Sequence, residues 1–133
     1  MDDKIIAVVK KPYKKPEKVE IPNTLEALQS IVGGLITSAD LPKINDVFGF
    51  CNDEGLLMGL DPNIYRPEYG DAIVGPIVYV GGDNDGNSIS LTPEQIKRVT
   101  AYLEENSAKD FAEFFYHINT GFENYKPKKQ ACM

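Results

Sequence analysis

The stretch KIIAVVKKPYKKPEKVEI, residues 4–21, places two β-prone runs on either side of a loop that is rich in lysine and proline. The runs, residues 5–9 and 18–21, contain many β-branched side chains, which fit the pleated surface of a sheet. Prolines in the loop between them, residues 10–16, favour a turn. The stretch predicts an antiparallel hairpin and therefore a fold built on a sheet.

A first helix is predicted directly after this hairpin, at residues 24–32. Asn23 can cap its N-terminus, and Glu26 stands three residues later, as in a capping box. Leucines and a valine recur at helical spacing, and two glycines that follow supply a C-terminal stop.

Two further helices are predicted in the C-terminal third. Thr92 and Gln95 form a capping box around Pro93, and proline is favoured at the first helical position. A last helix is predicted at residues 108–119, because large apolar residues share one of its faces. We expect that face to lie in the core; it is formed by Phe111, Phe114, Phe115 and Ile118.

A second hairpin is predicted in the middle of the chain. The sequence Asn-Asp-Glu-Gly at residues 52–55 fits a type I turn, with asparagine first and glycine last. The flanking apolar runs, residues 47–51 and 56–60, would then pair as strands.

The segment after this hairpin alternates between loop and strand. Residues 61–70 are expected to form a loop, and residues 72–80 form a strand candidate rich in β-branched side chains. Glycine and proline at positions 75–76 interrupt it, so we expect a bulge or an edge position there. A polar turn then leads to a short strand at residues 88–91.

Together these elements predict an α+β fold: a single domain over residues 1–125, with a mostly antiparallel β-sheet and about three helices. The chain has 133 residues, of which 42% are hydrophobic and 26% charged, enough for one core. Residues 126–133 are expected to be a flexible basic tail.

Location and redox state follow from what the sequence lacks. No apolar run is long enough to span a bilayer or to serve as a signal peptide, so we expect a cytoplasmic protein with no membrane partner. Cys51 and Cys132 are too few for a disulfide framework or a zinc site, and we expect both thiols to be reduced.

The negative charge is concentrated in the middle of the chain. Residues 40–94 contain ten carboxylates and two basic residues, while the net charge of the whole chain is -6. Such a segment repels the phosphate backbone, so duplex nucleic acid is not an expected partner. Solvation alone remains an alternative explanation of this acidity.

No catalytic set or metal site is evident. Residues 83–94 place acids or amides at several ligand positions of a calcium loop, but Ser88 occupies the position that requires glycine. His117 is the only histidine, and Cys51 has no orienting group beside it, which disfavours nucleophilic catalysis. We expect no catalytic residues, no metal and no cofactor, and we favour a protein that is not an enzyme.

Two loops are candidates for ligand binding. The first interleaves cations with an aromatic ring, a combination that holds phosphates and stacks a base; its candidates are Lys10, Tyr13 and Lys14. The second combines an amide, an arginine and two tyrosines, as recognition surfaces often do; its candidates are Asn63, Tyr65, Arg66 and Tyr69. A solvated hairpin tip and an ion pair of Arg66 with Asp61 or Asp71 are the respective alternatives.

Several short blocks resemble a known family. They are NTLEALQSIVGG at 23–34, CNDEG at 51–55, GLDPN at 59–63, DAIVG at 71–75 and SLT at 90–92. In this order they resemble a family of short domains of unknown function found in phages, conjugative elements and Firmicute genomes, over roughly residues 4–105. The resemblance assigns no catalytic residues. It implies an accessory protein of a mobile element, and such proteins often act against host defence.

The leading expectation is a non-enzymatic phage or mobile-element protein, located in the cytoplasm of the host cell, that binds and sequesters a small anionic ligand. A nucleotide immune signal is the ligand we expect, held in a pocket between copies of a homo-oligomer. The alternative is an acidic inhibitor that binds and blocks a host defence protein through the acidic middle. An enzyme acting on a nucleotide is a third possibility.

Overall fold

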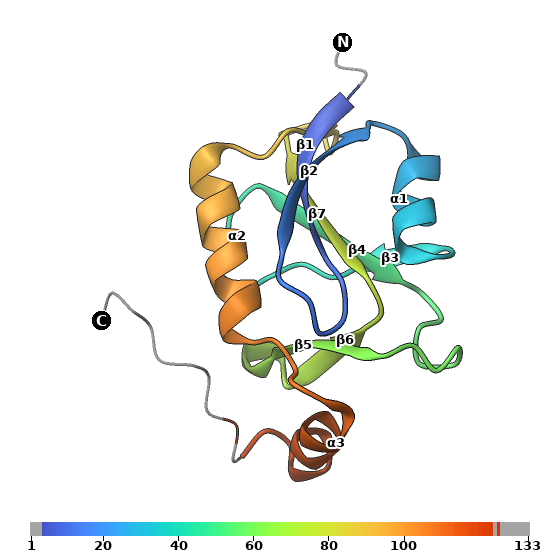
Figure 1. The fold of residues 1–133 in the computed structure, drawn as a ribbon. Helices are drawn as coiled ribbons and strands as arrows, with labels where there is room; N and C mark the ends of the chain where they lie inside the picture. Colours follow the sequence, from blue (N-terminus) through green and yellow to red (C-terminus); the bar gives the residue numbers. More distant parts are fainter. Residues whose placement is uncertain (1–3, 124, 126–133) are drawn as a thin grey trace.

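A six-stranded antiparallel sheet forms the framework of the protein (Figure 1). The computed structural model describes residues 4–123 and residue 125. The strand order is β2-β1-β7-β4-β3, and β8 pairs with β7. The strands of this sheet are β1 (Lys4–Lys10), β2 (Glu17–Pro22), β3 (Ile36–Ser38), β4 (Val47–Asn52), β7 (Ile77–Gly82) and β8 (Ser88–Ile89).

The hairpin predicted at the start of the chain is confirmed. β1 and β2 pair antiparallel, with Ile5 opposite Ile21 and Val9 opposite Glu17. β1 also pairs with β7 on its other side, through Val8 and Tyr79. The hairpin therefore supplies both an edge strand and a central strand of the sheet.

Helices cover the two faces of this sheet (Figure 1). On one face, α1 (Leu25–Val32) buries Leu28 and Val32 against side chains of β1 and β7. On the opposite face, α2 (Pro93–Glu105) buries Val99 and Leu103. The β-branched residues of β1 and β7 alternate between the two clusters, as the pleat of a strand requires.

The helix caps are set by local hydrogen bonds. Thr92 and Gln95 form the predicted capping box of α2. At α1 the cap is Thr24, whose hydroxyl accepts from the backbone N–H of Ala27, and not Asn23 as predicted. Asn23 is used elsewhere, because its side-chain amide donates to the carbonyl oxygen of Ser88.

The predicted second hairpin is wrong in its second half. β4 pairs with β3 and β7, while residues 53–59 form successive turns. The N–H groups of Met58 and Leu60 bond to the carbonyl oxygens of Glu54 and Gly55, so the segment closes on itself. A short apolar run does not distinguish a strand from such a turn by periodicity alone.

The predicted loop at residues 61–70 is also wrong. β5 (Pro62–Arg66) and the 3₁₀ helix η1 (Pro67–Tyr69) occupy it, and β5 pairs antiparallel with β6 (Asp71–Val74) in a separate two-stranded sheet. The strand predicted at residues 72–80 is interrupted at positions 75–76 as expected, but not by a bulge or an edge position: Gly75, with φ 79°, separates β6 from β7 (Ile77–Gly82). It marks a change of sheet, because β6 and β7 belong to different sheets.

α3 (Phe111–Thr120) lies at the end of the molecule beside β5 and β6 (Figure 1). Its cap is Asp110, so the helix begins three residues after the predicted start. The predicted core face is wrong: His117 is buried and Phe114 half-buried, whereas the other three residues named for that face are exposed. Backbone bonds just before the helix, such as Ala108 N–H to the Asn63 carbonyl, set its rotation.

These elements confirm the α+β class and the mostly antiparallel sheet. Within residues 4–123, none of the helices has the length and apolar character needed to cross a bilayer. The basic tail predicted at residues 126–133 lies outside the described residues.

Candidate functional site

Lys10 and Asn63, one from each predicted ligand-binding loop, meet in the interior. The Lys10 ammonium donates to Oδ1 of Asn63 at 2.8 Å and to the carbonyl oxygen of Lys11 at 3.0 Å. The Asn63 amide in turn donates to the carbonyl oxygens of Lys10 and Gly75, each at 2.7 Å. Both side chains are fully buried. They join the end of β1 to β5 and to the point where the chain changes sheets.

The charge of Lys10 has no carboxylate partner among the described residues. The ion pair found in that part of the chain joins Arg66 to Asp71. Burial lowers the pKa of Lys10 to about 8, since a low-dielectric interior disfavours the charged form. An anion could reach this ammonium only if the hairpin separated from β5.

Tyr65 stands at the centre of an aromatic cluster beneath α3. Its ring lies 5.9 Å from that of Phe114, 5.3 Å from His117 and 4.9 Å from Tyr125. Within the described part of the chain, neither the Tyr65 hydroxyl nor Nδ1 of His117 has a hydrogen-bond partner. Burial, with a contribution from the charge of Glu113, raises the pKa of Tyr65 well above its usual range. Tyr65 therefore anchors α3 and presents no surface to solvent.

Arg66 is held by three partners. Its guanidinium binds Asp71 in a bidentate ion pair at 2.9 and 2.6 Å and donates to the Asp40 carbonyl at 2.7 Å. It also lies 4.9 Å from the centre of the Tyr69 ring. The alternative reading of Arg66 as an ion-pair partner of Asp71 is confirmed.

The tip of the β1–β2 hairpin is the exposed part of the first predicted loop. Tyr13 and Lys14 are exposed, and Tyr13 adopts φ 63°, a left-handed conformation. Desolvation and the charges of Asp61 and Asp110 raise the pKa of Tyr13. Of the predicted ligand-binding residues, only Tyr13, Lys14 and Tyr69 have exposed side chains.

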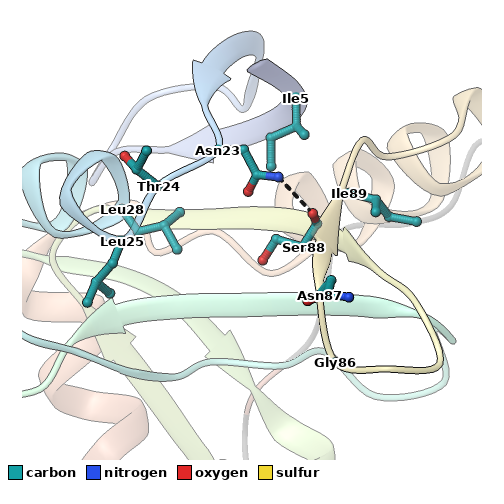
Figure 2. Close-up of a pocket in the computed structure, with 9 residues that line it drawn as sticks. All are labelled: Ile5, Asn23, Thr24, Leu25, Leu28, Gly86, Asn87, Ser88 and Ile89. Carbon is teal, nitrogen blue, oxygen red and sulfur yellow. Dashed lines mark hydrogen bonds between the residues drawn. The ribbon is translucent and has the colours of Figure 1, made fainter. Parts of the chain in front are cut away.

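A groove of about 640 Å³ lies between the start of α1 and the β7–β8 turn (Figure 2). Its lining residues are Ile5, Asn23, Thr24, Leu25, Leu28, Gly86, Asn87, Ser88 and Ile89. Asn23 bridges the two sides through its bond to Ser88 at 3.0 Å. None of these residues is charged, and none was predicted to bind a ligand. The groove therefore offers no charged side chain to pair with an anion. The two walls of the groove come from segments that are far apart in the sequence, so no local sequence pattern predicts the groove.

Among the described residues, the two most exposed large apolar side chains, Leu56 and Leu57, lie in the turns after β4. Leu56, Leu57 and Met58, here called the apolar knob, are 81%, 88% and 53% exposed. Backbone bonds hold the segment: Asp53 N–H donates to the Leu35 carbonyl at 2.8 Å, and Met58 N–H to the Glu54 carbonyl at 2.9 Å. The knob is thus a preformed projection.

Carboxylates flank the apolar knob on both sides along the chain. Asp53, Glu54 and Asp61 are exposed, and none of them forms an ion pair with another described residue. Leu35 is also exposed. Its carbonyl oxygen accepts from the Asp53 N–H, so Leu35 lies beside the start of the turns that form the knob. This surface has an apolar centre and an acidic rim formed by Asp53, Glu54 and Asp61. In the sequence, part of the same pattern is an acidic tetrapeptide, residues 52–55, followed by an apolar run.

The residues considered above for a metal or nucleophile site have structural contacts in the described part of the chain. Among residues 4–123 and 125, no three or more His, Cys, Asp or Glu side chains are grouped so that they could hold a metal ion. Asp83, first in the calcium-like loop, accepts from the N–H groups of Asp85 and Asn87. Cys51 belongs to the core beneath α2, where burial raises the pKa of its thiol, whereas His117 packs in the aromatic cluster.

The sheet, its two covering helices and the projecting knob define a small α+β domain with a candidate protein-binding surface. The chain belongs to the family described as domain of unknown function (DUF3846), which matches residues 4–104. The match ends within α2, so α3 lies beyond it. Neither the curated proteins nor the solved structures contain a significant match to the chain.

Proposed function

We propose that this protein is a non-enzymatic accessory protein of a phage or mobile element that binds and blocks a host defence protein through the apolar knob. The exposure of three consecutive apolar side chains on a hydrogen-bonded turn supports this proposal. Scattered surface apolar residues are ordinary, but a contiguous apolar patch with a polar rim is typical of an interaction site.

The preformed backbone of the knob favours tight binding. A segment that is already held by hydrogen bonds loses little conformational freedom on association, so more of the contact free energy contributes to affinity. Leu56 and Leu57 would enter an apolar pocket of the partner, as anchor residues at the centre of an interface do.

The acidic rim indicates the chemistry of the partner. Asp53, Glu54 and Asp61 would meet lysine or arginine side chains around the partner's pocket, which would raise the association rate at low salt. The resemblance to domains of phages and conjugative elements supports a host protein as the target. Blocking such a protein requires occupancy alone and no chemical step.

The test compares capture of host proteins by variants that keep the fold. Leu56→Ser with Leu57→Ser should abolish capture of a specific partner, whereas Leu25→Ser, which changes an equally apolar exposed residue in the groove, should retain it. Asp53→Lys with Glu54→Lys should weaken capture and remove its salt dependence, whereas Asp85→Lys in the β7–β8 turn should not. Partners that bind the wild type and the double serine variant equally would refute the proposal.

A second candidate is sequestration of a small anionic ligand at the hairpin tip. The observation that favours it is the set of exposed lysines there, Lys11, Lys14 and Lys15, which form no ion pair with described residues. Tyr13 between them could stack on a base. Titration calorimetry against cyclic and linear nucleotides tests this candidate, and binding should disappear in Lys11→Glu with Lys14→Glu. An absence of heat across the panel would exclude it.

A further inference from the structure

The outward face of α3 has an unusual composition. All its exposed residues are uncharged, and they are Phe111, Ala112, Phe115, Tyr116, Ile118 and Asn119. Its inward face contains the polar His117 and Glu113. A surface helix normally shows the opposite arrangement, with apolar residues inside and charged residues outside.

The apolar side chains on this face form a continuous ridge. Phe111 and Phe115 stack with ring centres 6.2 Å apart and planes within 13°. Ile118 follows after three more residues, so the spacing is four and then three, which is the spacing of a seam between two packed helices. The exposed fractions of Phe111, Phe115 and Ile118 are 63%, 57% and 41%.

We propose that this face binds the same face of a second copy of the chain, so that two α3 helices pack antiparallel across a two-fold axis. In that arrangement Phe115 faces its own counterpart, and Phe111 of each copy faces Ile118 of the other. A two-fold contact uses one patch twice and closes at two copies. The small Ala112 beside the ridge would allow the helices to approach closely.

Charges at the two ends of α3 suit this orientation. Lys109 precedes the helix and Glu123 follows it, both are exposed, and neither forms an ion pair within the described part of the chain. Antiparallel pairing places Lys109 of each copy near Glu123 of the other. It also sets the two helix dipoles in opposite directions, which is favourable.

The composition of α3 disfavours a membrane surface as the occupant. An interfacial helix has lysine or arginine on its polar face to bind anionic lipids. α3 contains no lysine or arginine, and Asp110 and Glu123 at its two ends are acidic. α3 therefore lacks the basic side chains that would hold such a helix on an anionic bilayer.

The size of the patch sets the expected strength of the dimer. Taking roughly 200 Å² for a whole aromatic side chain, the exposed apolar parts of the face amount to roughly 400 Å² per copy. The total is below that of a standard stable interface, so a dissociation constant in the micromolar range or weaker is expected. Dimerisation through α3 does not depend on the partner proposed for the apolar knob.

Sedimentation equilibrium of the full chain, from about 1 μM to about 1 mM, tests the proposal. The average mass should rise with concentration from 14.8 kDa and level off at twice that value. Phe115→Ser should remain monomeric at protein concentrations at least tenfold above the midpoint of wild-type dimerisation. Leu57→Ser, at a leucine of the knob that is even more exposed, should dimerise as the wild type does.

A charge exchange tests the antiparallel orientation separately. Lys109→Glu should weaken the dimer several-fold, and Lys109→Glu combined with Glu123→Lys should restore it. A constant monomer mass, growth beyond two copies, or dimerisation of Phe115→Ser equal to that of the wild type would each overturn the proposal. So would a monomer in solution that binds phosphatidylcholine vesicles through this face.

Discussion

Lys10 and Asn63 are 53 residues apart in the sequence and share a hydrogen bond of 2.8 Å in the fully buried interior. The pair connects the hairpin of the main sheet with the small β5–β6 sheet. An ammonium with two neutral acceptors and no carboxylate partner in the described part of the chain is a costly arrangement. Its consequences for stability can be measured directly.

Stability should rise with pH between about 8 and 10 because of Lys10. The pKa of Lys10 is about 8 in the folded state, whereas an ordinary lysine, as in the unfolded chain, has a pKa of 10.5. Between these values the unfolded state binds more protons, so raising the pH favours the folded state, by up to about 3 kcal/mol if the whole difference is realised. Urea unfolding at several pH values should show this rise in the wild type and not in Lys10→Met. Parallel pH profiles of the two proteins would contradict it.

Loss of the Asn63 side chain should be severely destabilising. Asn63→Ala removes three hydrogen bonds and leaves the Lys10 ammonium and two carbonyl groups with fewer partners in the interior, so a loss of about 3 kcal/mol or more is expected. The control is Asn87→Ala, an exposed asparagine bonded to Asp83, which should cost less than about 1 kcal/mol. Denaturant midpoints of the two variants give the comparison, and similar values would be inconsistent with the buried network.

Two buried tyrosines should respond differently to loss of the hydroxyl. The Tyr79 hydroxyl donates to the Ala39 carbonyl at 3.2 Å, so Tyr79→Phe should cost about 1 kcal/mol. The Tyr65 hydroxyl has no such partner among the described residues, so Tyr65→Phe should change the free energy of unfolding by less than about 0.5 kcal/mol or increase it. A larger loss for Tyr65→Phe would show that Glu113 accepts from this hydroxyl.

A methyl group at Gly49 should not be tolerated. A Cβ there would collide with the Tyr79 ring and would lie 2.5 Å from the Ala39 carbonyl oxygen, so Gly49→Ala should cost about 2 kcal/mol through overpacking. At Gly34 the nearest atom, the side-chain nitrogen of Asn52, would be 3.0 Å away. Gly34→Ala should therefore cost less, and thermal melting of both variants tests the order.

The elements that were predicted correctly are those specified by neighbouring residues. The first hairpin follows from two β-branched runs around a proline loop, and the capping box of α2 needs only Thr92 and Gln95. Cap and turn hydrogen bonds form within a few residues, so the sequence contains all the information they require. The α+β class followed from these local signals.

The errors arise where distant contacts decide the outcome. The run after β4 reads as a strand, but β4 takes β3 and β7 as its partners, and the apolar knob is left outside the sheet. On α3, Phe111 and Phe115 read as core residues, yet the backbone contacts of β5 with the segment before the helix turn His117 inward. The hydrophobic effect favours burial of an apolar side chain, but it is non-directional and does not determine which surface covers that side chain.

Among the predicted binding residues, the sequence by itself determined that Lys10, Asn63 and Arg66 would have polar roles, because ammonium, amide and guanidinium groups need partners wherever they lie. Only the tertiary structure decided that those partners are internal. Whether a polar side chain meets solvent, a ligand or another part of the chain depends on which segments the fold brings together. That choice is made by packing over long sequence separations, which local patterns do not encode.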